Sequence, residues 1–134
     1  GSPPPPQDWQ KFTAGRLPGL LDFEVVELGA GLVRAKMPVA PAHLAPNGRL
    51  HAASVVALAD TACGIGARLA LPDGAAGFAT VDLTTSYLGT AREGWVHAVA
   101  TLAHGGRRTQ VWDAVVSDDN ERTIALFRCT QLIV

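Results

Sequence analysis

The sequence is poor in cysteine and has almost no net charge. Only two of its 134 residues are cysteines, Cys63 and Cys129, and they lie far apart with no Cys-x-x-Cys spacing. This excludes a disulfide-rich scaffold and a cysteine-based zinc site, and it is typical of the reducing cytoplasm, where we expect the protein to reside. The net charge is −1, so no basic excess favours binding to nucleic acid or to an anionic membrane.

Charged residues are also scarce, at 17%, whereas hydrophobic residues make up 48% of the chain. This balance is typical of a globular protein, and the length is that of one domain with one hydrophobic core. The start of the chain is the exception, because Gly1–Ser2 is typical of a cloning remnant and four prolines follow it. We expect residues 1–7 to form a disordered Pro-rich arm and residues 8–134 to form the domain.

Neither the first residues nor the longest apolar run of the sequence has the features of a secretion signal or a membrane span. The first residues contain neither a positive stretch nor an apolar stretch of the kind found in signal peptides. The longest apolar run, Ala52 to Leu71, carries Asp60 and Arg68, whereas a membrane span rarely holds two charges near its middle. We interpret this run as the buried helix of a soluble protein.

The periodicity predicts an α+β fold. Residues 8–16 predict a short amphipathic helix, residues 22–38 a hairpin or a strand with a tight turn, and residues 40–50 a loop. The alanine-rich segment 52–69 favours a long helix. Period-two patterns then predict strands at 78–88, 95–104, 108–117 and 123–134. Their short turns imply antiparallel pairing for at least the last three strands, so we expect the sheet to wrap around a single helix.

The long helix is apolar on two sides. One stripe, expected to pack on the sheet, contains Val55, Leu58, Ala62, Ile65 and Leu69. Asp60 lies roughly 200° around the helix from Leu58, on nearly the opposite side. Five of its six helical neighbours are small residues, which leaves room for a ligand. A helix that is apolar all round needs a second covering surface, and the simplest cover is another copy of the chain in a twofold dimer.

Asp60 carries the sharpest functional signal. A buried carboxylate without a partner is costly, so it is paired, protonated or catalytic. The sequence leaves two readings open at this point. Asp60 either performs chemistry in the apolar slot, or it only accepts hydrogen bonds from nearby backbone or from a facing subunit.

The loop before the helix offers a second candidate group. The first N–H groups of a helix have no internal partners and carry partial positive charge, so they can stabilise an oxyanion. Asn47 could orient a water or a carbonyl, and His51 could hold the loop or cap the helix. The alternative for His51 is a packing role. Ser54 lies within the helix and no GxSxG elbow exists, so a Ser-His-Asp triad fits poorly.

Metal and thiol chemistry fit less well. His43, His51 and Asp60 do not have the spacing of a zinc site, and we expect no metal. Cys63 follows Asp60 by one helical turn but lacks an evident activating histidine. A buried, unreactive thiol is therefore the expected role of Cys63.

Four segments form a recognisable set when they are taken together: Asn47–His51, Ala57–Ala62, Ala79–Leu83 and Gly106–Thr109. In order and spacing they resemble the hotdog-fold acyl-CoA thioesterases, and within them the PaaI-like, phenylacetate-related branch. The resemblance implies a five-stranded antiparallel sheet wrapped around the long helix. It also implies a homodimer with active sites at the subunit interface, often doubled into a homotetramer as a dimer of dimers.

The resemblance implies hydrolysis of an acyl-CoA, with an aromatic or arylacetyl group as one candidate, and no cofactor. The acidic residue of the family falls on Asp60, as general base or as nucleophile. The backbone N–H that polarises the thioester carbonyl falls on Ala52, and the polar loop residue falls on Asn47. Relatives usually carry His-Gly-Gly before the helix, whereas here His51 precedes two alanines.

The remaining site candidates follow in the same way. Thr80 is the hydroxyl that would reach in from the neighbouring subunit, and Thr61 follows Asp60 as in many relatives. Thr61 and Ala53 are expected to contact substrate. Arg107 and Arg108 follow a tight turn and either bind the phosphates of coenzyme A or form a solvated hairpin tip.

Two other functions stay open. A hotdog dehydratase acting on a 3-hydroxyacyl thioester pairs a histidine with a carboxylate across the interface, as His51 and Asp60 would. A non-catalytic acyl-CoA binding or sensing module would bind without turnover, and the two alanines after His51 motivate this reading. The short Pro-Asn-Gly loop and the Leu-Ala-Asp-Thr helix favour the thioesterase.

Overall fold

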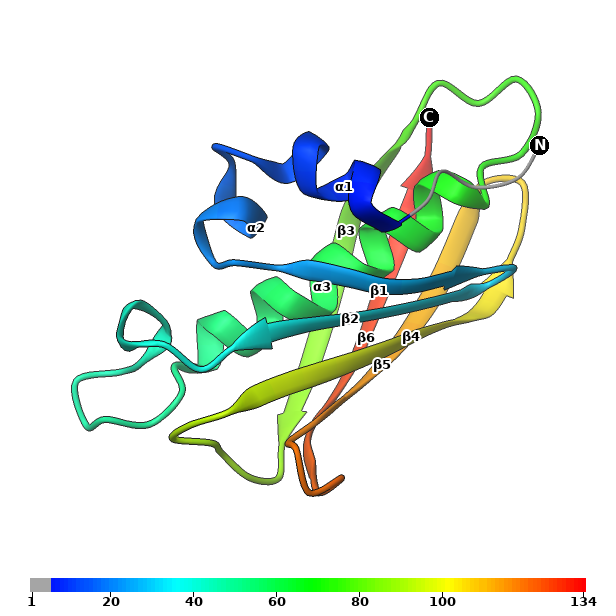
Figure 1. Ribbon diagram of the computed structural model, residues 1–134. Coiled ribbons are helices and arrows are strands. Elements are labelled where there is room, and N and C mark those ends of the chain that lie inside the picture. Colours follow the sequence, from blue (N-terminus) through cyan, green and yellow to red (C-terminus); the bar gives the residue numbers. More distant parts are fainter. Residues whose placement is uncertain (1–5) are drawn as a thin grey trace.

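Six antiparallel strands curve around one long helix (Figure 1). The computed structural model describes residues 6–134. The strands are β1 (Glu24–Gly29), β2 (Leu32–Pro38), β3 (Phe78–Tyr87), β4 (Trp95–Gly105), β5 (Thr109–Ser117) and β6 (Thr123–Ile133). They pair in the order β1-β2-β4-β5-β6-β3, so the strand that follows the long helix in sequence lies at the far edge of the sheet.

The sheet has one strand more than the five implied by the resemblance. The extra strand arises because the segment 22–38 folds into the two-stranded hairpin β1–β2 rather than a single strand. Gly31 turns the chain with a φ of 67°, which a side chain would disfavour. The expected antiparallel pairing of the last three strands is confirmed.

The helices agree with the predicted pattern at the centre of the chain and differ at its start. The long helix α3 spans Ala52–Leu69, as predicted, whereas α1 spans Pro6–Thr13 and a short α2 spans Leu17–Leu20. Residues 6 and 7 are therefore helical rather than part of the expected arm, and proline suits the start of a helix. The remainder of that arm, residues 1–5, lies outside the described residues.

The sheet side of α3 is closely packed. Val55, Leu58, Ala62 and Ile65 are all buried, as predicted, but Leu69 is 37% exposed because it is the last residue of the helix. By length and hydropathy alone α3 could cross a membrane, yet half of it is buried inside this fold. Packing against the sheet accounts for the apolar character of this side of α3.

The N-terminal helices supply part of the second cover that α3 requires. In Figure 1, α1 and α2 lie beside α3, and α1 also contacts the edge strand β1. Trp9 of α1 is only 6% exposed and belongs to the hydrophobic core. A second copy of the chain was expected to provide this cover, whereas the chain provides some of it itself. The opposite edge strand, β3, is largely exposed.

Candidate active site

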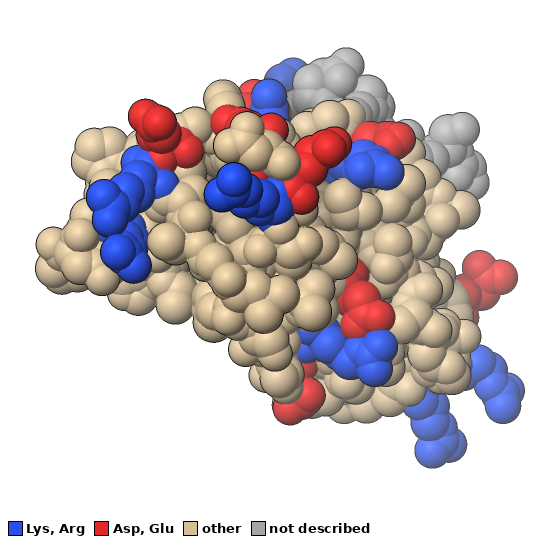
Figure 2. Space-filling model, turned by 90° about the horizontal axis from the view of Figure 1, so that it is seen from below, with Lys and Arg blue, Asp and Glu red and all other residues tan. Residues whose placement is uncertain are grey.

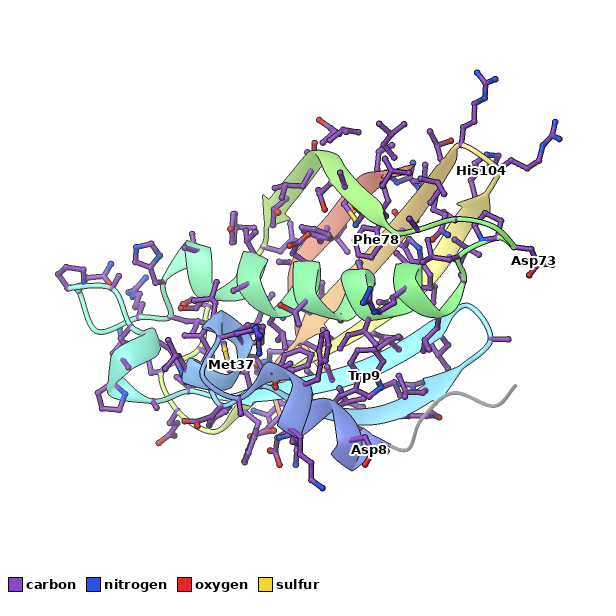
Figure 3. The ribbon with its side chains drawn as sticks, turned by 90° about the horizontal axis from the view of Figure 1, so that it is seen from above. Asp8, Trp9, Met37, Asp73, Phe78 and His104 are labelled. Carbon is purple, nitrogen blue, oxygen red and sulfur yellow. The ribbon has the colours of Figure 1, made fainter. Side chains whose placement is uncertain are left out.

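Asp60 lies in the wall of a cavity of about 300 Å³. The cavity is bounded by α1, the turn after it and the start of α2, by α3 and by the start of β3. Figure 3 shows Trp9 and Phe78 on opposite sides of α3 in this region. The lining is mostly apolar, and ligand sites of this kind combine apolar walls with a few convergent polar groups.

The Asp60 carboxylate has a buried oxygen without a partner. Its Oδ1 is enclosed and accepts no hydrogen bond from any part of the chain that the structure describes. Burial raises the pKa of the Asp60 carboxyl above its usual range, because desolvation disfavours the charged form. A carboxylate with a raised pKa is a stronger base once ionised. The sequence left Asp60 as paired, protonated or catalytic. The structure shows no pairing partner for its Oδ1 within residues 6–134.

Two predicted threonines share the cavity with Asp60. Thr61 and Thr80 both line this cavity of their own chain, and the reach of Thr80 into the site of a neighbouring subunit stays a prediction. The Thr80 hydroxyl donates to Oε1 of Gln131 at 2.7 Å. Gln131 is fully buried, and its Nε2 donates in turn to the Cys129 sulfur at 3.4 Å. Gln131 was missed from sequence, although an amide at an inward position of a strand is a signal for such a network.

The start of α3 forms a separate group. His51 caps the helix, because its Nδ1 accepts the Ala53 N–H at 2.9 Å. The Ala52 N–H makes no hydrogen bond to any of residues 6–134. The Ala52 carbonyl accepts the hydroxyl of Tyr87, the only tyrosine of the chain, at 2.8 Å. Tyr87 was also missed from sequence. The one free donor at this helix start is thus the predicted oxyanion donor.

Asn47 serves the loop in this structure. Its Oδ1 accepts the backbone N–H of Arg49 at 3.0 Å, which closes a turn around Gly48, whose φ is 83°. Asn47 and Ala52 line a second cavity, of about 260 Å³, together with Tyr87. Asn47 therefore lies beside the helix start, as predicted, but its side-chain oxygen is engaged locally.

The two groups do not meet within one chain. Asp60, Thr61 and Thr80 line one cavity, whereas Asn47 and Ala52 line another. Asp60 and Ala52 are eight residues apart on α3. At 1.5 Å per residue this corresponds to about 12 Å along the helix. One thioester carbonyl cannot reach both the donor and the carboxylate of the same chain.

Arg107 and Arg108 lie at the exposed tip between β4 and β5 and do not line the Asp60 cavity. Figure 2 shows basic and acidic side chains interspersed on the face that it presents, rather than one broad basic patch. Within residues 6–134, no three histidine, cysteine or acidic side chains cluster in a way that could hold a metal ion.

Cys63 is buried and unpaired as a disulfide among the described residues, which agrees with the prediction of a buried thiol. A hydrogen bond with the Cys129 thiol and burial both raise the pKa of Cys63 far above its usual range. A thiol in this environment is a poor nucleophile, because the thiolate is disfavoured.

Comparison with known proteins decides the family. A family model described as the thioesterase superfamily matches residues 47–125. The chain belongs to the thioesterase superfamily. A thioesterase structure from Haemophilus influenzae superposes with a TM-score of 0.93 at 26% identity, covering 99% of this chain and 92% of that chain. The hotdog fold expected from sequence is confirmed.

Relatives within the thioesterase superfamily carry names of thioester hydrolases. The proofreading thioesterase EntH of Cronobacter turicensis is 30% identical over 122 residues, 91% of this chain and 88% of its own. A 1,4-dihydroxy-2-naphthoyl-CoA hydrolase of Listeria monocytogenes is 29% identical over 110 residues, 82% of this chain and 89% of its own. The PaaI protein of the Escherichia coli phenylacetic acid operon shares the fold, with a TM-score of 0.83 at 20% identity over 95% of this chain and 90% of that chain. This thioesterase is therefore an enzyme of the thioester hydrolase class.

Proposed function

We propose that the protein hydrolyses an acyl-CoA to the free acid and coenzyme A, with Asp60 as the catalytic carboxylate. The observation that carries the proposal is the unpartnered, enclosed oxygen of Asp60 in the wall of an apolar cavity. A buried polar atom without a partner destabilises the fold, so its presence is best explained by a role in chemistry.

Asp60 can act in either of two balanced ways. As a general base it takes a proton from water, whose oxygen attacks the thioester carbonyl carbon and expels the coenzyme A thiolate. As a nucleophile its oxygen attacks that carbon itself and expels the coenzyme A thiolate, which leaves an anhydride; water then hydrolyses this anhydride to the free acid and the regenerated Asp60 carboxylate. In both routes the Ala52 N–H stabilises the oxyanion, and no metal or other cofactor takes part.

The complete site needs two copies of the chain in this proposal. The donor and the carboxylate of one chain lie about 12 Å apart along α3, so the α3 start of one copy must approach Asp60 of another. The exposed edge strand β3 supports such pairing, because its Val81 and Leu83 are 58% and 42% exposed. A further contact through the outer face of the sheet would double this dimer into the expected homotetramer.

An aromatic or arylacetyl group is the preferred acyl candidate. Phe12 and Phe78 line the Asp60 cavity together with Trp9, so aromatic rings lie on both of its sides. The relative named as a dihydroxynaphthoyl-CoA hydrolase points in the same direction. Arg107 and Arg108 remain candidates for the phosphates of coenzyme A, reached from the hairpin tip.

The test is a free-thiol release assay on aryl-, arylacetyl- and straight-chain acyl-CoAs, run beside Asp60→Asn. We expect wild-type turnover that falls at least about a thousandfold in the variant, as for loss of an essential acid–base or nucleophilic group. Asp73→Asn, a surface change in the loop after α3, is the matched control. Unchanged turnover by Asp60→Asn would contradict the assignment. A 3-hydroxyacyl-CoA is added to the panel for the alternative reactions. A new double bond without free thiol from this substrate would instead indicate the dehydratase, and binding of acyl-CoA without either product would indicate the acyl-CoA-binding module.

A further inference from the structure

One wall of the Asp60 cavity is made by the N-terminal helix α1. Trp9 and Phe12 line the cavity, with ring centroids 5.5 Å apart in an edge-to-face arrangement. Trp9 is 6% exposed, whereas Phe12 is 56% exposed at the cavity rim. Figure 3 shows Trp9 between α1 and the central helix. This wall is therefore built by a segment far in sequence from the catalytic helix.

A contact between helices holds the wall in place. The guanidinium of Arg68, near the end of α3, lies 5.7 Å from the centroid of the Phe12 ring. Cations at this distance from an aromatic face are attracted to it. Arg68 and Phe12 both line the cavity, so this contact joins α1 to α3 beside the space that Asp60 faces.

The indole N–H of Trp9 is enclosed but unused. Its Nε1 is enclosed and has no hydrogen-bond partner among residues 6–134. An enclosed donor without a partner opposes folding, and phenylalanine or leucine would avoid this cost. The ring of Trp9, rather than its N–H, makes the contacts seen here, because it packs in the hydrophobic core and lines the cavity.

The opposite side of the cavity is set by a glycine. A Cβ added at Gly64 would meet only the tip of the Phe78 ring, at 3.7 Å. That is ordinary van der Waals contact, so a methyl group fits without displacing its neighbour. Gly64 therefore keeps open space in the cavity that the backbone does not require.

We propose that α1 determines the size of the acyl group: Trp9 forms the end wall of the acyl cavity, and the Phe12–Arg68 contact holds that wall against α3. The inference rests on the proposed function, because it takes the Asp60 cavity as the acyl site. A volume of about 300 Å³ corresponds to about ten water-sized groups, at about 30 Å³ each. An apolar cavity of about 150 Å³ holds benzene, so this space accepts a single ring easily and a fused two-ring system only tightly, with the Trp9 ring as its limit.

The experiment compares a one-ring with a two-ring substrate in variants that move the wall in opposite directions. Trp9→Leu and Phe12→Ala widen the cavity, and Gly64→Ala narrows it. The ratio of kcat/KM for 2-naphthoyl-CoA to kcat/KM for benzoyl-CoA should rise about tenfold in Trp9→Leu. It should fall about tenfold in Gly64→Ala, which adds one methyl group to the cavity wall. Leu20→Ala, an exposed change on α2 outside the cavity lining, should leave the ratio unchanged.

The ratio is measured within each variant, so partial unfolding does not move it. If Trp9→Leu fails to fold, Phe12→Ala and Gly64→Ala still test the inference. Both should fold, because Phe12 is exposed and alanine is favourable in a helix. Calorimetry then gives the Kd of each variant for uncleavable thioether analogues of the two substrates, and the ratio of these two Kd values is compared in the same way. Turnover with ratios that these variants leave unmoved overturns the inference alone. Shifted Kd ratios without any turnover overturn the proposed hydrolysis alone. If the protein shows no binding and no turnover, both the hydrolysis and the inference about α1 are overturned.

Discussion

The two faces of α3 show how one helix can serve folding on one side and chemistry on the other. Gly66 faces the sheet, where an added Cβ would overlap the Trp112 indole. Gly64 lies two residues away and faces the Asp60 cavity, where an added Cβ meets only the Phe78 ring at 3.7 Å. The same residue type thus permits close packing at one position and preserves open space at the other.

The polar groups on the two faces differ in the same way. The Trp112 indole N–H donates to Gln110 at 2.8 Å, and Gln110 donates to the Ala70 carbonyl at 3.0 Å. On the cavity face, both the Trp9 indole N–H and Asp60 Oδ1 are enclosed without partners. Satisfied buried groups stabilise a fold, whereas unsatisfied ones destabilise it. The contrast locates the part of the molecule that is shaped by something other than stability.

After Asp60→Asn, the largest effect on catalysis should come from removing the backbone N–H of Ala52 at the start of α3. Ala52→Pro deletes the candidate oxyanion N–H, and proline is tolerated at the first helical position. His51 already has the extended conformation that a following proline requires, with φ −67° and ψ 137°. We expect kcat to fall about 10²–10³-fold with little change in the free energy of unfolding. Thiol release and urea denaturation measure the two quantities.

Mixing chains then tests whether two copies complete the site. Ala52→Pro and Asp60→Asn are each inactive as homodimers under the proposal. After co-refolding in equal amounts, a mixed dimer contains one intact site, and activity should return to about a quarter of the wild-type value. Mixing Ala52→Pro with itself is the control. No recovery in verified mixed dimers would mean that each site lies within a single chain.

On the sheet face, Gly66→Ala should affect stability rather than catalysis. Its new methyl group overlaps the Trp112 ring, which is fully buried and cannot move without displacing the core. Overpacking of this kind destabilises by about 1–3 kcal/mol. Urea denaturation should show the loss, while kcat per folded molecule stays within a factor of about two of wild type. An unchanged unfolding midpoint would show that the helix can shift on the sheet.

The matched change on the cavity face should have a smaller effect of the opposite sign. Gly64→Ala removes a flexible residue from a helix interior and meets no clash, so we expect about 0.5–1 kcal/mol of added stability. We also expect Gly64→Ala to shift the substrate preference toward smaller acyl groups. If the variant changed only stability, this preference would stay the same. Denaturation and the substrate panel, run on one preparation, separate these results.

Local pattern was sufficient for most of the fold. The α3 bounds follow from an alanine-rich run that begins after a capping histidine, and the strands follow from period-two alternation. The position of α1 did not follow, because the docking of a short helix depends on tertiary contacts such as those of Trp9 and Phe12. The cover over Asp60 was consequently assigned wholly to a second copy.

The site was predictable residue by residue but not as an arrangement. Asp60, Thr61 and Thr80 come together, and Ala52 has the free N–H that was expected. The gap between Ala52 and Asp60 follows from helical rise alone, at about 12 Å, and shows that the two groups cannot act on one carbonyl in one chain. Gln131 and Tyr87 were missed because their partners lie 51 and 35 residues away in sequence.

The smallest effect should be the pH dependence of the Asp60→Asn stability change, because the carboxylate keeps part of its access to the cavity. Burial raises the pKa of Asp60 in the folded state, so the folded protein binds this proton more tightly than the unfolded chain. Stability contributed by this group is therefore lost as pH rises from the unfolded value of 3.8 through the raised pKa. Asparagine does not ionise, so Asp60→Asn should gain stability relative to wild type at pH 7 and lose that gain at pH 4. Urea denaturation at both pH values measures the gap, and a gap that widens on acidification would mean that Asp60 is stabilised as a carboxylate by a partner that forms in solution.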